Sequence, residues 1–182
     1  MRPLFISLFV IALLLPASLF AQLEKGRYMV GGSGSAQVSS ADERSTLSIS
    51  ASPRLGYFFA DNFVIGAALF LSLSNNEDYR WNSAGLTPFL RYYFYTIAKM
   101  QLFGEARVGV SSNRNYNKIS DITTNDGGPR LGLELGMACF LTPSVALEGS
   151  LNYNYAQQSA NFATNNFGLF FGFQIFLSEL KL

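Results

Sequence analysis

Six charged residues occupy alternating positions in segments that are otherwise apolar or small: Arg54, Arg91, Glu105, Arg107, Glu134 and Glu148. Each lies about four to eight residues from the nearest predicted short turn, which at ~3.3 Å per residue confines them to a band about 15 Å tall. If one hairpin turns about Ala98, Arg91 lies directly across from Glu105. A lone charge in a narrow interior is costly to desolvate. We therefore expect a network of ion pairs, rather than six separately hydrated polar groups, with Arg130 higher up and outside it.

The chemistry available to the chain is limited by its residue types. It has no His and a single Cys, Cys139. A Ser-His-Asp triad, most zinc sites, a CxxC motif and an intramolecular disulfide are therefore excluded. Asp121 and Asp126 lack the spacing and the closing Glu of a calcium loop. The sequence predicts no catalytic residue, no metal site and no cofactor, and its net charge of +1 gives no reason to expect nucleic acid as a partner.

The N-terminus has the order of a secretory signal peptide. Arg2 precedes an apolar run over residues 4–15, and the small residue Ala21 follows a few positions later. The run is shorter than the ~20 residues that a membrane-spanning helix requires, which argues against an anchor. We expect cleavage after Ala21, so that residues 1–21 are the signal peptide and residues 22–182 form a single domain.

Period-two alternation of apolar residues with small or polar residues runs through eight segments of the remaining chain. This pattern is typical of strands that bury one face. Only 14% of the 182 residues are charged, about half of the ~25% usual in soluble domains. The sequence therefore predicts an all-β, eight-stranded antiparallel up-and-down transmembrane β-barrel. The residues predicted to face lipid are Leu47, Ile49, Leu69, Leu71, Leu90, Val108, Leu133, Leu135, Leu147, Leu151, Leu169, Phe171 and Phe173.

Connection lengths predict which end of the barrel faces outward. Long polar stretches alternate strictly with short ones; the long ones are residues 39–44, 75–82, 111–128 and 157–165, and the short ones are residues 60–62, 96–100 and 141–144. Outer-membrane barrels place short turns in the periplasm and long loops outside. We therefore expect both termini to be periplasmic.

Aromatic residues gather beside the short turns. A periplasmic aromatic girdle is predicted from Tyr57, Phe59, Tyr92, Phe94 and Phe140. A plain core cluster is the alternative explanation for these rings.

The alternation alone does not say which face is outside. A secreted lipocalin-like barrel that binds a ligand would also have eight strands, with its apolar face turned inward. Its outer surface would be dense in charges, whereas the polar face here is mostly Gly, Ser, Asn and Thr, which fit a narrow lumen better. The composition of the polar face favours the membrane barrel.

Three segments resemble a known family. Residues 53–58, 88–94 and 139–148 are similar to those of small outer-membrane β-barrel proteins of Gram-negative bacteria, often labelled porin-family and related in architecture to the OmpA/OmpX type. The resemblance implies membrane lipid and the outer-membrane insertion machinery as partners. That machinery reads a last-strand signal which Asn166, Gly168, Phe171 and Phe173 fit, although the chain continues nine residues past Phe173.

Several functions are compatible with such a barrel. The one we favour is a charge-plugged lumen with a structural role that presents surface loops, in adhesion or envelope integrity, because eight-stranded barrels are usually filled by side chains. A narrow porin for small solutes is the first alternative, and the secreted lipocalin-like barrel is the second. An enzyme is not expected, since the barrel enzymes compared rely on a catalytic His. The sequence does not identify a ligand for the surface loops.

Overall fold

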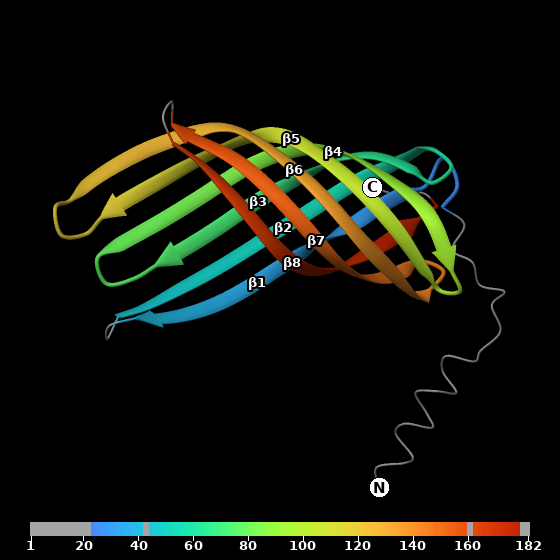
Figure 1. The fold of residues 1–182 in the computed structure, drawn as a ribbon, viewed down its shortest axis with the longest axis horizontal. Coiled ribbons are helices and arrows are strands. Elements are labelled where there is room, and N and C mark those ends of the chain that lie inside the picture. The colour runs from blue at the N-terminus through green and yellow to red at the C-terminus, as the bar shows by residue number, and fades with distance from the viewer. Residues whose placement is uncertain (1–22, 42–43, 160–161, 179–182) are drawn as a thin grey trace, which may run out of the picture.

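A computed structural model describes residues 23–41, 44–159 and 162–178. These residues form one closed antiparallel barrel in which each strand pairs with the next in sequence and β1 pairs with β8 (Figure 1). The strands are β1 (Tyr28–Ala41), β2 (Arg44–Ala60), β3 (Phe63–Asn75), β4 (Tyr79–Ile97), β5 (Met100–Asn117), β6 (Ile122–Thr142), β7 (Val145–Ser159) and β8 (Phe162–Leu177). The predicted fold class is confirmed. The predicted signal peptide, residues 1–21, lies outside the described residues.

The apolar face of the strands is the outer surface of the barrel. All thirteen residues predicted to face lipid are exposed, from 46% for Leu47 to 72% for Phe171. Because successive side chains of a strand point to opposite faces, the intervening residues point into the barrel. An apolar exterior around a charged interior is the reverse of a lipocalin-like barrel, so that alternative is wrong. No described segment forms a helix able to span a bilayer.

The prediction of four long polar loops is wrong. The strands extend through most of these stretches, and the residues between them are only 42–43, 76–78, 118–121 and 160–161. The β5–β6 ladder, for example, continues to the pair Asn117 and Ile122. Alternation disappears there because both faces are polar, yet the backbone hydrogen bonds do not depend on side-chain polarity. Four long β-hairpins therefore occupy one end of the barrel, opposite the three short turns (Figure 1).

The seam that closes the barrel is short. β1 pairs with β8 only from Tyr28 and Leu177 up to Ser33 and Gly172. Over the described residues beyond this point, β1 pairs only with β2, and β8 pairs only with β7. The two hairpins that flank the seam therefore separate toward the hairpin end.

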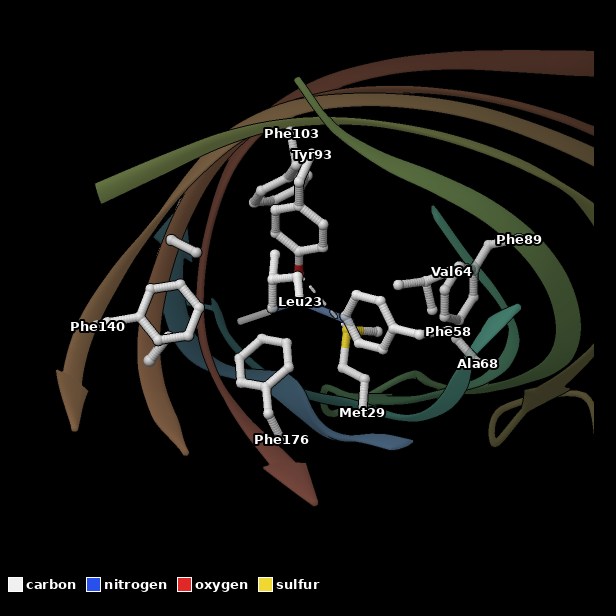
Figure 2. Packing of buried hydrophobic residues seen from close by; sticks show 12 residues of the cluster. Leu23, Met29, Phe58, Val64, Ala68, Phe89, Tyr93, Phe103, Phe140 and Phe176 are labelled. Carbon is white, nitrogen blue, oxygen red and sulfur yellow. Dashed lines mark hydrogen bonds between the residues drawn. The ribbon is translucent and has the colours of Figure 1, made fainter. Parts of the chain in front are cut away.

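A hydrophobic cluster fills the interior near the short turns (Figure 2). Its members are Leu23, Met29, Phe58, Val64, Ala68, Phe89, Tyr93, Phe103, Ala138, Phe140, Ala146 and Phe176. The Phe140 and Phe176 ring centroids lie 5.2 Å apart, and those of Phe58 and Phe176 lie 6.0 Å apart. This end of the lumen is thus packed like the core of a soluble domain.

One member of the predicted aromatic girdle belongs to this interior cluster instead. Phe140 is 5% exposed, whereas Tyr57, Phe59, Tyr92 and Phe94 point outward and are 37–45% exposed. The reason is strand alternation: Phe140 shares its face of β6 with the inward-pointing Ala138. All five rings lie beside the short turns, but Phe140 points into the barrel and the other four point outward.

Candidate functional site

The six predicted lumen charges lie together in the interior, on five different strands. Arg54 comes from β2, Arg91 from β4, Glu105 and Arg107 from β5, Glu134 from β6 and Glu148 from β7. Cross-strand pairing places three of them at the same height in the barrel, because Arg91 pairs with Glu105 and Glu105 pairs with Glu134. All six are buried except Arg107, whose side chain is 12% exposed. We call these six residues the ion-pair network.

Arg91 is the most enclosed member of the network. Its Nε lies 2.7 Å from Oε2 of Glu105, and its Nη1 lies 2.6 Å from Oε1 of Glu148. Nη1 also donates to the Tyr93 hydroxyl at 3.2 Å, and the guanidinium carbon sits 3.9 Å from the centroid of the Phe103 ring. With 0% exposure, Arg91 exchanges its hydration shell for two carboxylates, a hydroxyl and a ring face.

The other two guanidinium groups contact Glu105 and the remaining carboxylate, Glu134. Arg54 Nη1 lies 3.3 Å from Glu105 Oε2, and Arg107 Nη1 lies 3.1 Å from Glu134 Oε2. Glu105 and Glu134 are cross-strand neighbours, so their like charges would repel without the three cations around them. Longer contacts of 3.7–4.0 Å join all six residues into one system.

Two polar side chains of this layer were not predicted from the sequence. Gln174 of β8 donates to Glu148 Oε2 at 3.1 Å, and the Tyr93 hydroxyl receives the bond from Arg91. Both lie at inward positions of their strands, so the alternation that located the charges also contained the signal for them. Gln174 and Tyr93 are missing from the predicted network because that prediction considers charged residues alone.

The side chains of the network fill space and pair charges, but few of them could act in catalysis. Its carboxylates are all engaged by guanidinium groups. Within the described ranges, no group of three or more Cys, Asp or Glu residues is placed to hold a metal ion. The arrangement can therefore fill and neutralise the lumen.

The remaining predicted site residues lie on the last strand. Asn166, Gly168, Phe171 and Phe173 all belong to β8, and Phe171 and Phe173 point outward. Nothing in the geometry of a single chain reports on recognition by an insertion machinery, so this role stays a prediction.

A closed eight-stranded barrel with an apolar exterior and charged interior defines a membrane-spanning β-barrel of the outer-membrane class. The outer membrane protein beta-barrel domain family matches residues 7–174, so the chain belongs to this family. Its location is accordingly the outer membrane. No curated protein sequence matches the chain.

Solved structures with the same fold include several small outer-membrane proteins. Neisserial surface protein A matches with a TM-score of 0.60 and 18% identity, over 83% of this chain and 97% of that one. The attachment invasion locus protein Ail of Yersinia pestis has a TM-score of 0.52 and 11% identity, over 84% and 99%. OprG of Pseudomonas aeruginosa has a TM-score of 0.52 and 13% identity, over 87% and 99%. At these identities the likeness establishes the fold.

Proposed function

We propose that this protein is a closed outer-membrane barrel whose lumen is plugged by charge, and that its role is to hold four hairpins at the cell surface. The observation that carries the proposal is the burial of Arg91 between Glu105 and Glu148, above a layer of packed aromatic rings. Water and ions would have to displace both layers to pass. Breaking a buried ion pair leaves an uncompensated charge, which makes spontaneous opening costly.

The proposed orientation rests on the family and on the four long hairpins that lie opposite the three short turns. Residues 1–21 would be removed on export, and both ends of the residue 22–182 barrel would face the periplasm with the short turns. The hairpins would then extend outside the cell, and the outer band of Leu, Ile and Phe residues would contact lipid. Insertion would use the assembly machinery of the outer membrane, guided by the last strand.

The proposed role is structural, in adhesion or envelope integrity, and not enzymatic. The chain has no His to act as a general base, and the buried carboxylates are committed to ion pairs. The polar hairpins are the parts free to meet a partner outside the cell. Ail, one of the structures with this fold, is named an attachment invasion locus protein, which supports adhesion as the first activity to test.

Solute flux distinguishes the closed barrel from the porin alternative. Purified protein is reconstituted into liposomes, and swelling in small sugars and amino acids is compared with that of protein-free liposomes and of a known porin. The closed barrel predicts swelling no faster than in protein-free liposomes. Swelling that scales with protein amount and falls with solute size would establish a porin instead.

Adhesion is tested by shortening one hairpin without touching the barrel. Replacing residues 113–126 with a two-residue type I′ turn removes most of the β5–β6 hairpin above the band of apolar residues. The surface role predicts normal insertion with reduced attachment of cells to host-cell or matrix surfaces. Attachment unchanged by shortening of each hairpin in turn would contradict it.

A further inference from the structure

A cavity lies in the lumen on the hairpin side of the ion-pair network. It encloses about 590 Å³ of empty space, open mouth included, and is lined by Ser52, Phe70, Thr87, Arg107, Arg130 and Asn154 among others. On β2, β4, β6 and β7 the lining residues are farther from the short turns than the network residues; Ser52 lies beyond Arg54, for example, and Arg130 lies beyond Glu134. On β5, Arg107 belongs to both the network and the lining. The network thus forms the floor of this cavity, which we call the arginine cup.

The cup has a cation without a carboxylate partner. Among the described residues, no carboxylate oxygen lies within ion-pair distance of the Arg130 guanidinium, which rests on the Phe70 ring at 4.2 Å from its centroid. The network and Arg130 together bring four guanidinium groups to this part of the lumen against three carboxylates. The guanidinium groups therefore exceed the carboxylates by one positive charge, and the unmatched group, Arg130, lies on the side of the cup.

Arg107 contributes unused donors to the same space. Its Nη1 faces Glu134 and its Nε lies 3.7 Å from Glu105 Oε1, but neither Nε nor Nη2, both buried, has a hydrogen-bond partner. Buried polar groups are nearly always paired, so two orphaned guanidinium nitrogens beside a cavity mark a place for an acceptor. Gly132 allows the Asn154 and Arg107 side chains to lie close to β6: a Cβ on it would lie 2.9 Å from Asn154 Oδ1 and 3.0 Å from Arg107 Nε.

The cup has room for a small group. Its empty space of about 590 Å³, open mouth included, is many times the ~30 Å³ that one water occupies in the liquid. Phosphate and sulfate have five heavy atoms, and a carboxylate group is smaller.

We propose that the arginine cup binds an oxyanion group, namely phosphate, sulfate or carboxylate, between Arg107 and Arg130. Planar guanidinium forks match the paired oxygens of such groups better than a single halide ion. The group can arrive as a free anion through the hairpin end, or as the headgroup of an anionic lipid through the separated strands beyond Ser33 and Gly172. The site does not depend on whether the lumen conducts or on what the hairpins bind.

Isothermal titration calorimetry with inorganic phosphate tests the cup. Folded protein in a non-ionic detergent at low ionic strength is titrated as wild type, Arg130→Gln and Phe70→Leu, each checked by circular dichroism for β structure. Phe70→Leu retains every charge and removes only the ring under Arg130. The matched control is Arg114→Gln, which removes the same charge from an exposed position of the β5–β6 hairpin.

The cup predicts saturable one-to-one binding that weakens by about tenfold or more in Arg130→Gln, weakens in Phe70→Leu, and is unchanged in Arg114→Gln. Absence of saturable heat from the wild type up to about 10 mM phosphate would overturn the proposal. Equal loss in Arg114→Gln and Arg130→Gln would also overturn it, because the effect would then be one of overall charge.

A second arm identifies the source of the anion. The phosphate titration is repeated in micelles that contain phosphatidylglycerol, and again in micelles with the zwitterionic phosphatidylcholine. Competition by phosphatidylglycerol alone supports the site and assigns it to a lipid headgroup. Phosphate binding that neither lipid reduces supports the site and assigns it to a free anion.

Discussion

Arg91 of β4 and Glu105 of β5 are direct partners in the ladder, and the Arg91 Nε lies 2.7 Å from Glu105 Oε2. The turn that joins their strands does not produce this register by itself. Next to the turn Ile97 pairs with Met100, a register that would place Ala106 opposite Arg91. A β-bulge between Tyr93 and Tyr95 shifts the pairing by one residue and brings Glu105 opposite Arg91.

Removing the charge of Glu105 should destabilise the barrel. Glu105→Gln keeps the shape of the side chain but leaves the three network guanidinium groups facing two carboxylates. We expect the free energy of unfolding to fall by about 3–5 kcal/mol. Urea titration in lipid vesicles measures it, with the exposed Glu77→Gln as a control that changes it by less than about 0.5 kcal/mol. Equal small effects for both variants would mean that the network does not stabilise the fold.

Sequence patterns predicted the strands and the level of the charges because both depend on strand alternation. The pair Arg91–Glu105 was expected from a turn about Ala98, and the ladder contains that pair. The structure reaches it by a different path, through a turn at residues 98–99 combined with the bulge. The turn is centred half a residue later than expected, and the bulge compensates for that difference. Nothing in the local sequence distinguishes this result from a plain turn about Ala98.

Two sequence predictions fail for physical reasons. The hairpins are predicted as loops because alternation reports burial of one face, and a ladder with water on both faces carries no such signal. Phe140 is predicted to face outward because it lies at the height of the other rings, whereas its place in the alternation of β6 turns it inward. Alternation predicts Arg130 outside the network, but its contact with the Phe70 ring and the cup itself depend on which side chains from eight strands meet.

A charged residue on the lipid-facing surface should destabilise the barrel. Leu135→Arg places a guanidinium on the outer face of β6, where Leu135 is 58% exposed. Transfer of Arg into the bilayer midplane should reduce the free energy of unfolding in vesicles by about 2–4 kcal/mol. Ile119→Arg, in the connection between β5 and β6, is the matched control and should change it by less than about 0.5 kcal/mol. A neutral Leu135→Arg would place that surface outside the bilayer.

The interior position of Phe140 is testable against an outward ring of the same type. Phe140→Ala removes a ring that packs 5.2 Å from Phe176, and we expect a loss of about 3–5 kcal/mol in the free energy of unfolding. Phe59→Ala, which is 42% exposed, should cost clearly less in the same vesicles. A larger loss of stability in Phe59→Ala than in Phe140→Ala would mean that Phe140 points outward as a member of the girdle.

Surface labelling should reveal which end of the barrel faces outward. Lys118 lies in the β5–β6 connection, and Lys99 lies in the short β4–β5 turn at the opposite end. An impermeant amine-reactive reagent added to intact cells should modify Lys118 and not Lys99, as read by peptide mass spectrometry. Permeabilised cells provide the control in which both react. Modification of Lys99 alone in intact cells would invert the topology.

The central claim is that the ion-pair network and the aromatic layer close the lumen, and single-channel recording in a planar bilayer tests it most directly. Wild-type protein should insert without steady conductance, whereas the double variant Glu105→Ala plus Glu148→Ala, which strips two carboxylates from Arg91, should show brief openings or reduced stability. A stable, ion-selective open channel formed by the wild type would contradict the account and establish the narrow porin in its place.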